Sequence, residues 1–257
     1  MSGQLFTRAI LRKPGKSMIK GLRSADLGIP DYDLALRQHA DYVRALQLCG
    51  LETIVLDADE RYPDSVFVED TALLTPSCAI ITRPGAETRR GEVIEMREII
   101  AGHYSMIHEI REQGTVEAGD IMMVGSHFYI GLSERTNREG AGQVILFLEQ
   151  HGMTGSTVEL ENMLHLKTGV SYLENNNLLA CREFMYSKEF SDFHILEVSP
   201  EESYAANCIW VNDNVLIPSG YPLTRDRIKA AGYKIIELDV SEFRKLDGGL
   251  SCLSLRF

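Results

Sequence analysis

The chain has 257 residues, of which 44% are hydrophobic and 25% are charged, and these values are ordinary for a globular protein. Its formal net charge of -11 argues against nucleic acid as a partner, because surfaces that bind nucleic acid are basic. An acidic protein attracts cationic substrates, although the same charge also simply keeps a protein soluble. No segment has the uninterrupted apolar length of a membrane span, so a membrane is not an expected partner.

The five cysteines are irregularly spaced and include no Cys-x-x-Cys pair. This usage argues against a disulfide framework and favours a reducing compartment. Charged residues interrupt the N-terminal stretch too early for the apolar run of a signal peptide. We therefore expect a cytoplasmic protein.

In chain order, the predicted elements begin with a helix over Tyr32–Leu48 and a strand over Glu52–Leu56. Four hairpin-like stretches follow, each with two short β-prone runs around a polar turn. These stretches are Asp70–Arg83, Asp120–Leu132, Gly169–Cys181 and Asn207–Pro218. The helical patterns after them are Glu87–Ile100, Asn137–His151, the weaker Glu183–Phe190, and Leu223–Ala231.

This repeated strand–hairpin–helix unit cannot bury its apolar face alone and must pack against its neighbours. Closing the units into a ring also removes exposed sheet edges. We therefore expect an α/β fold whose first and last strands lie near each other. Because no linker or compositional break is present, residues 1–257 are expected to form a single domain.

Cys252 follows two adjacent glycines, Gly248 and Gly249, and we expect it in a terminal strand. A thiolate at this position could attack an electrophilic carbon. Considered alone, a cysteine here is better explained as a small buried hydrophobic residue.

His165 lies between two leucines just before the third hairpin. It could act as a general acid and base for a nearby thiol, or it could be a core histidine with satisfied hydrogen bonds. The other six histidines have more polar neighbours and are expected at the surface: His39, His103, His108, His127, His151 and His194.

Carboxylates gather where the first two hairpins begin. Glu117 and Asp120 flank a glycine before the second hairpin, and the stretch Asp64–Asp70, if extended, places both of its aspartates on one face and Phe67 on the other. Turn chemistry and a solvated edge are the structural alternatives. In a closed ring these starts converge at the centre, where carboxylates, a histidine and a cysteine suit a substrate with a cationic electrophilic carbon, such as a guanidinium.

Seven stretches, in order along nearly the whole chain, carry a resemblance to a known family. They are Pro63–Asp70 (PDSVFVED), Ile80–Ala86 (IITRPGA), Val116–Val124 (VEAGDIMMV), Arg135–Asn137 (RTN), Leu164–Gly169 (LHLKTG), Ser203–Val211 (SYAANCIWV) and Asp247–Phe257. With them the chain resembles the dimethylarginine dimethylaminohydrolases, especially the bacterial ones. The resemblance implies the pentein fold, a five-bladed pseudosymmetric α/β propeller with a central active site.

The resemblance also implies roles for individual residues. Cys252 would be the nucleophile, His165 the general acid and base, and Glu117 the residue that orients His165 and helps to hold the guanidinium. The implied substrate-binding residues are Asp70 for the guanidinium nitrogens, Asp64 with the backbone of Leu22 and Leu246 for the α-amino group, Arg89 and Arg135 for the α-carboxylate, and Phe67 for the aliphatic stem. One departure is Ala118, where many relatives carry glycine.

The implied reaction converts Nω-methylated L-arginines to L-citrulline and methylamine or dimethylamine. It passes through a covalent thiouronium intermediate on Cys252 and needs no metal or organic cofactor. Arginine deiminase, or another guanidino-group hydrolase or transferase of the same fold, is the nearest alternative. A non-catalytic arginine-binding module is a second, and a metallohydrolase is disfavoured because closely spaced ligand pairs are absent from the sequence. The expected partner is a small cationic amino acid, and a homodimer stays an open option.

Overall fold

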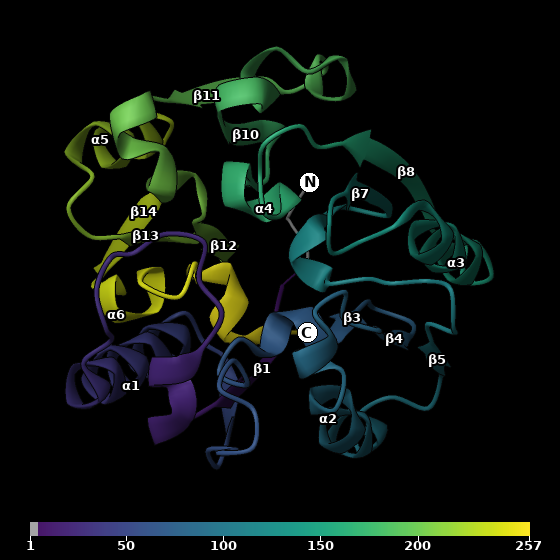
Figure 1. The fold of residues 1–257 in the computed structure, drawn as a ribbon. Helices are drawn as coiled ribbons and strands as arrows, with labels where there is room; N and C mark the ends of the chain where they lie inside the picture. The colour runs from purple at the N-terminus through teal and green to yellow at the C-terminus, as the bar shows by residue number, and fades with distance from the viewer. Residues whose placement is uncertain (1–4) are drawn as a thin grey trace.

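The computed structural model describes residues 5–257, and within them five three-stranded sheets are arranged in a ring (Figure 1). In each sheet the central strand pairs antiparallel with one neighbour and parallel with the other. Four sheets use consecutive strands: β3 to β5 (Ala72–Leu74, Ala79–Ile81, Ile107–Glu109), β6 to β8 (Ile121–Val124, His127–Leu132, Thr154–Glu159), β9 to β11 (Val170–Tyr172, Asn177–Cys181, His194–Val198), and β12 to β14 (Ile209–Val211, Asn214–Pro218, Lys234–Leu238).

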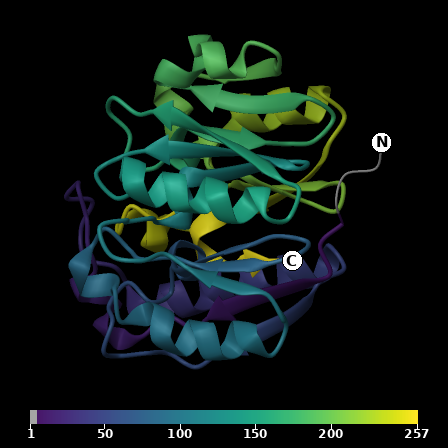
Figure 2. The same ribbon diagram turned by 90° about the vertical axis from the view of Figure 1, so that its right-hand side faces the viewer.

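The fifth sheet joins the two ends of the described chain (Figure 2). Its central strand β1 (Arg8–Arg12) runs parallel to β2 (Glu52–Leu56) and antiparallel to β15 (Leu255–Arg256). The Phe257 carbonyl accepts hydrogen bonds from the backbone N–H groups of Thr7 and Arg8, both at 2.8 Å. The prediction that the first and last strands are neighbours is therefore confirmed.

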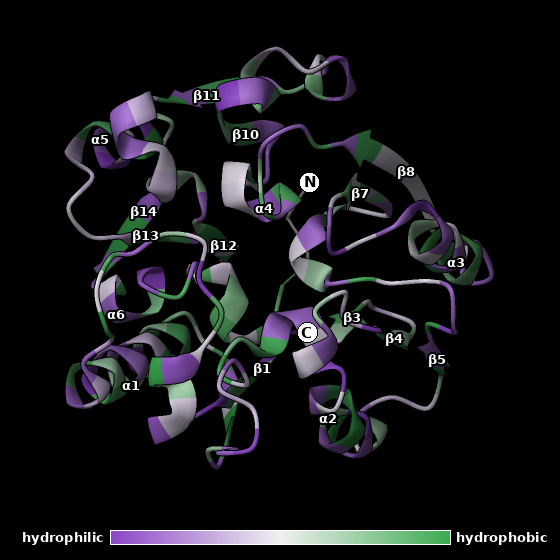
Figure 3. Ribbon diagram, viewed as in Figure 1, coloured by the Kyte–Doolittle hydropathy of each residue, from purple (hydrophilic) through white to green (hydrophobic). Residues whose placement is uncertain are grey.

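Four longer helices cover the outside of the ring (Figure 1): α1 (Tyr32–Leu48), α2 (Glu92–Ala101), α3 (Arg138–Glu149) and α5 (Pro222–Ala230). Two of them start at side-chain caps, where Asp31 accepts from the Leu34 N–H at 2.9 Å and Asn137 accepts from the Gly140 N–H at 2.8 Å. Hydrophobic and hydrophilic residues are interspersed along these helices (Figure 3), as expected for helices with one buried face. Within residues 5–257 no helix is long and apolar enough to cross a membrane.

The four predicted hairpins are confirmed, and in each the first strand begins one or two residues later than the sequence pattern indicated. The expected helix at Glu183–Phe190 is wrong, because that segment forms two 3-10 turns, Arg182–Tyr186 and Lys188–Phe190. The expectation that His39 lies at the surface is also wrong, since His39 is on the buried face of α1 and burial lowers its pKa to about 4.

The stretch Asp64–Asp70 is not extended, which corrects the predicted alternation of its faces. The Phe67 N–H bonds to the Asp64 carbonyl at 2.9 Å, and a 3-10 turn follows at Val68–Thr71. These short-range bonds bend the segment, and all seven residues from 64 to 70 are buried. Cys252 likewise lies in a 3-10 turn, Ser251–Leu253, one residue before β15 and not inside a strand.

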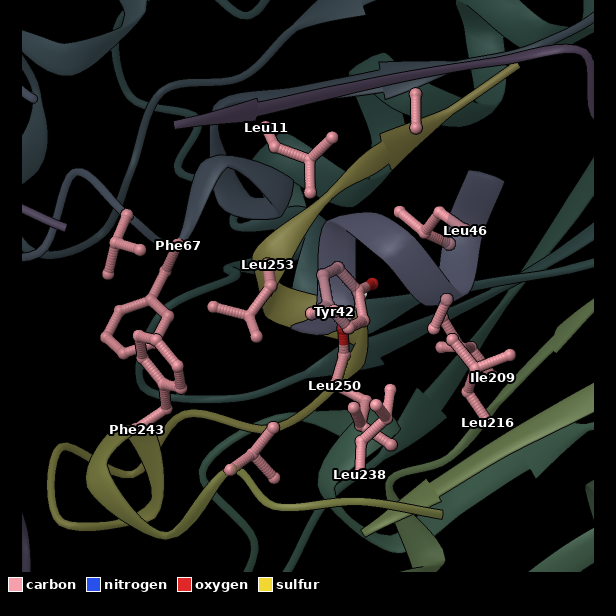
Figure 4. Close-up of a cluster of buried hydrophobic side chains, with 14 of the residues drawn as sticks. Leu11, Tyr42, Leu46, Phe67, Ile209, Leu216, Leu238, Phe243, Leu250 and Leu253 are labelled. Carbon is pink, nitrogen blue, oxygen red and sulfur yellow. Dashed lines mark hydrogen bonds between the residues drawn. The ribbon is translucent and has the colours of Figure 1, made fainter. Parts of the chain in front are cut away.

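A large apolar cluster anchors that turn to the outer helix α1 (Figure 4). The buried Tyr42 hydroxyl donates to the Leu250 carbonyl at 2.8 Å and lies 2.8 Å from Ser254 Oγ. Leu250 and Leu253 are fully buried on either side of Cys252. Because the backbone on both sides of Cys252 is held by α1 and by the core, the position of the thiol is set by packing.

Candidate active site

All ten residues that the sequence singled out line one cavity of about 230 Å³. The cavity lies where short turns from different blades meet: Val68–Thr71, Ala118–Asp120, α4 (Leu166–Gly169) and Ser251–Leu253. These turns gather near the centre of the ring in Figure 1. The ten residues are Leu22, Asp64, Phe67, Asp70, Arg89, Glu117, Arg135, His165, Leu246 and Cys252.

Cys252 is a partly exposed, unpaired cysteine in a tightly packed turn. Its Sγ accepts a long hydrogen bond, 3.4 Å, from the Gly249 N–H. Both preceding glycines are needed for space: a Cβ at Gly248 would lie 2.2 Å from the Phe67 ring, and a Cβ at Gly249 would lie 2.5 Å from the Asn207 amide. Burial, with the nearby carboxylates of the site, raises the pKa of Cys252 to about 12. The thiol is therefore neutral near pH 7 until a cation is bound beside it.

His165 caps the N-terminus of α4 and is buried, with its Nε2 atom 2.8 Å from Glu117 Oε2. Burial alone would lower its pKa. The carboxylates of Asp120, Asp70 and Glu117 outweigh that effect and raise the pKa of His165 to about 9. The imidazole is therefore protonated at neutral pH and can supply a proton to a leaving group.

Glu117 is held from several sides. Its Oε1 atom accepts from the Ala86 N–H at 3.0 Å, and its own N–H donates to Thr136 Oγ1 at 3.1 Å. Burial would raise its pKa, but the hydrogen bond from His165 and the nearby cations hold the pKa of Glu117 below its usual value. Glu117 is therefore an ionised partner that fixes the orientation of His165.

Asp70 and Arg89 form a buried ion pair beside the catalytic candidates. Asp70 Oδ2 accepts from Arg89 Nη1 at 2.6 Å, and Asp70 Oδ1 accepts from the Gly119 N–H at 3.0 Å. Arg89 also donates to Glu92 Oε2 at 2.9 Å and to the Phe67 carbonyl at 2.8 Å. In this structure the guanidinium of Arg89 is thus held by protein acceptors. Pairing with a substrate carboxylate would require it to exchange one of them.

The remaining predicted residues form the outer part of the cavity. Arg135 is more exposed than Arg89, and its Nη1 atom lies 3.9 Å from Glu117 Oε1. Asp64 Oδ1 accepts from the Leu22 N–H at 2.9 Å, and burial raises the pKa of Asp64. A bound ammonium group would offset that burial and favour the ionised form of Asp64.

Two positioning residues were missed by the assignment of roles from sequence. Asp120, fully buried, accepts from the Leu166 N–H at 2.9 Å and from the Ser133 hydroxyl at 2.7 Å, so it fixes the start of α4 next to His165. Asn207 accepts from the Ser251 N–H at 3.0 Å and therefore holds the turn of Cys252. Asp120 directly precedes β6 and Asn207 lies two residues before β12, and this position at the entry to an apolar strand was the available signal.

Asp70, Glu117 and His165 each place a potential metal-ligand atom within 4.8 Å of the others. Hydrogen bonds from Gly119, Arg89 and Ala86 already orient both carboxylates toward an ionised imidazole. This arrangement suits a planar organic cation with several N–H donors.

A five-bladed α/β propeller whose central pocket holds a thiol, an imidazole and carboxylates defines the pentein class. The family model described as "N,N dimethylarginine dimethylhydrolase, eukaryotic" matches residues 31–254. The N(G),N(G)-dimethylarginine dimethylaminohydrolase of Pseudomonas aeruginosa is 59% identical over 254 residues, which is 98% of this chain and 100% of that protein. The Streptomyces coelicolor protein of the same name is 33% identical and covers 97% of this chain and 96% of its own. The chain therefore belongs to the dimethylarginine dimethylaminohydrolase family.

Solved structures agree with this assignment. The Pseudomonas aeruginosa enzyme, as a cysteine-to-serine mutant complexed with citrulline, superimposes with a TM-score of 0.98 at 58% identity, over 99% of this chain and 100% of that chain. The N-terminal domain of ArgZ, an arginine dihydrolase from cyanobacteria, has a TM-score of 0.88 at 18% identity and covers 98% of this chain and 97% of that chain, which shows a shared fold. The family resemblance and the pentein fold inferred from sequence are both confirmed.

Proposed function

We propose that this protein hydrolyses Nω-methylated L-arginines to L-citrulline and methylamine or dimethylamine. The observation that carries the proposal is the single cavity shared by the Cys252 thiol, the buried His165–Glu117 pair and the Asp70 carboxylate. A relative that is 59% identical over nearly the whole chain carries the name of this activity, and a close structural neighbour is complexed with citrulline.

In the proposed complex, Asp70 and Glu117 hold the guanidinium group, and Phe67 lies along the aliphatic stem. Asp64 and the backbone of Leu22 and Leu246 receive the α-amino group. Arg135 binds the α-carboxylate, a task that suits the planar fork of a guanidinium. Arg89 also binds the α-carboxylate if it gives up one of its hydrogen bonds to protein acceptors. Otherwise its role is to neutralise the charge of Asp70.

The proposed chemistry begins when the substrate cation lowers the pKa of Cys252 and the thiol proton leaves to solvent. The thiolate attacks the guanidinium carbon, and protonated His165 gives its proton to the methylated nitrogen as the C–N bond breaks. The amine departs and a thiouronium remains on Cys252. Neutral His165 then takes a proton from water as that water attacks the same carbon. Loss of the Cys252 thiolate, with the proton of the new hydroxyl passing to solvent, yields the ureido group of L-citrulline.

We further propose that residues 1–257 act as one catalytic domain in the cytoplasm. Support for the domain comes from the pairing of β1 with β15, which ties the two ends of the described chain into one sheet. Support for a reducing compartment comes from the five cysteines, which all lie in the described residues and are all unpaired.

The test compares dimethylarginine with arginine as substrate and follows citrulline, dimethylamine and ammonia. Mass spectrometry of quenched turnover should show an adduct on Cys252 that is absent from Cys252→Ser. General acid and base catalysis is worth about 10²- to 10⁴-fold, so His165→Ala should lose at least that much in kcat.

A serine variant with a near-normal rate, or a His165→Ala loss of only a few-fold, contradicts the assigned roles. Ammonia release from arginine, without dimethylamine release from dimethylarginine, would assign the protein to arginine deimination.

A further inference from the structure

A second group of side chains with potential metal-ligand atoms lies away from the cavity, where two blades meet at the rim of the ring. Cys78 precedes β4, His108 lies in β5, and His151 follows the C-terminus of α3. Each offers one sulfur or nitrogen atom, and these three atoms all lie within 4.8 Å of one another. Figure 1 places β4, β5 and α3 on the side of the ring away from the Cys252 turn. We propose that Cys78, His108 and His151 form a binding site for a zinc-like transition-metal ion.

The two histidines are brought together by the fold and not by sequence proximity. His108 pairs with Ile80 across the parallel β4–β5 ladder, which fixes its position near Cys78. Its ring stacks on Phe147 of α3, with centroids 4.5 Å apart and planes 13° apart. The Nε2 atoms of His108 and His151 are 2.9 Å apart. The two nitrogens share a hydrogen bond, and the rings meet edge-on with centroids 5.1 Å apart, so an ion bound between them would replace that hydrogen bond.

The distances are close to those of a tetrahedral zinc site. Zinc–nitrogen bonds of about 2.0–2.1 Å place two nitrogen ligands roughly 3.3 Å apart, and a zinc–sulfur bond of about 2.3 Å places sulfur roughly 3.6 Å from each nitrogen. The observed separation of 2.9 Å between the two Nε2 atoms needs only a small widening. The thiol of Cys78 lies within 4.8 Å of one ring nitrogen of each histidine and 3.4 Å from Thr75 Oγ1, so it must give up that contact and rotate or shift by the order of 1 Å.

The donor set also selects the class of ion. Imidazole and thiolate ligands favour zinc, cobalt and copper over magnesium and calcium, which prefer oxygen. Binding requires both imidazoles to be neutral and Cys78 to lose its proton, which passes to solvent. The fourth position of a tetrahedral ion would be taken by water, because three protein ligands leave it open.

The test uses Co²⁺ as a spectroscopic probe on the full-length chain carrying Cys252→Ser, so that the thiol of the catalytic cavity cannot contribute. We expect one Co²⁺ per chain with a thiolate-to-cobalt charge-transfer band and a tetrahedral visible spectrum. His108→Asn should weaken Co²⁺ and Zn²⁺ binding by at least about 100-fold, because even second-sphere changes cost 10- to 100-fold. His103→Asn, at an exposed histidine outside the group, is the matched control.

Thermal unfolding gives an independent readout, since an ion that binds only the folded protein raises its melting temperature. Zn²⁺ should raise the melting temperature of the parent and of His103→Asn but not of His108→Asn. In a chain with Cys252 intact, His108→Asn should keep the full hydrolase rate, so this result is separate from that of the proposed reaction. Absence of the charge-transfer band in the parent, or its persistence in His108→Asn, overturns the proposal.

Discussion

At Gly119 the backbone passes close to His165 and Asp70, and replacing this glycine with alanine is an informative perturbation. A Cβ added there would lie 2.8 Å from His165 Nδ1 and 2.9 Å from Asp70 Oδ1. Its backbone is not in the left-handed region, because Gly119 is not among the glycines with positive φ. The effect of Gly119→Ala must therefore be steric and not conformational.

The expected magnitude follows from these distances. Ordinary contact begins at 3.4 Å, so the His165 ring must retreat by about 0.6 Å, the difference between 3.4 and 2.8 Å. Misplacing a catalytic group by about 1 Å can cost on the order of 100-fold in rate. We expect Gly119→Ala to lower kcat by about 10- to 100-fold and to raise KM as well, because the added Cβ also lies 2.9 Å from the Asp70 carboxylate that is proposed to hold the guanidinium.

The assay is steady-state release of citrulline from dimethylarginine, with urea unfolding as a check of the fold. Gly142→Ala is the matched control, since a Cβ at Gly142 in α3 meets nothing within 4 Å. It should keep full activity and gain roughly 0.5–1 kcal/mol in stability, because alanine is the better helix former. A Gly119→Ala enzyme whose kcat stays within two-fold of the parent would refute the steric argument.

Two further predictions concern the thiol and the buried arginine. Burial and nearby carboxylates raise the pKa of Cys252 to about 12. Alkylation of Cys252 by iodoacetamide in the free enzyme should therefore be slow at neutral pH, and its rate should still increase with pH above about pH 8. A rate that no longer changes with pH at neutral pH would contradict the raised pKa. Glu92→Gln removes one of two carboxylates paired with the buried Arg89 and should cost about 3 kcal/mol in urea unfolding. Glu87→Gln, at an exposed pair with Arg90, should change stability by less than about 1 kcal/mol, and equal effects of the two substitutions would disprove the role given to burial.

Much of the architecture could be predicted because it is encoded locally. Helix α1 begins and ends where its apolar pattern predicts, with Asp31 as the cap. The hairpins were indicated by β-prone runs around short polar turns. The repeat then limited the fold to a ring, since each unit leaves an apolar face to be covered.

Errors arose where short-range hydrogen bonds or tertiary burial overrode the pattern. The bend at Phe67 depends on its N–H bond to Asp64, which alternation of residue types does not reveal. His39 has a polar neighbour in sequence, Gln38, but it is on the face of α1 that packs against the core. The environment of Arg89 was also hidden, because its partner Asp70 lies 19 positions away in sequence and meets it only in the folded blade.

The membership of the cavity was predictable from the family resemblance, but its electrostatics were not. Burial lowers the pKa of His165 and three carboxylates raise it. The balance between these effects depends on distances that cannot be read from any sequence motif. The same holds for Asp120, whose influence comes from its complete burial beside α4.

The pairing of β15 with β1 has a consequence for the order of folding. It joins groups as far apart in sequence as Thr7 and Phe257, which are 250 positions apart, so it closes a loop that spans nearly all of the described residues. Contacts of such long range form slowly. Once the other four blades have formed, Glu117 and His165 are already in place. The turn that carries Cys252 is then held by Asn207 but not yet by the pairing of β15 with β1. During refolding, enzymatic activity should therefore return later than secondary structure. The delay between the two signals would report the time needed to close the ring.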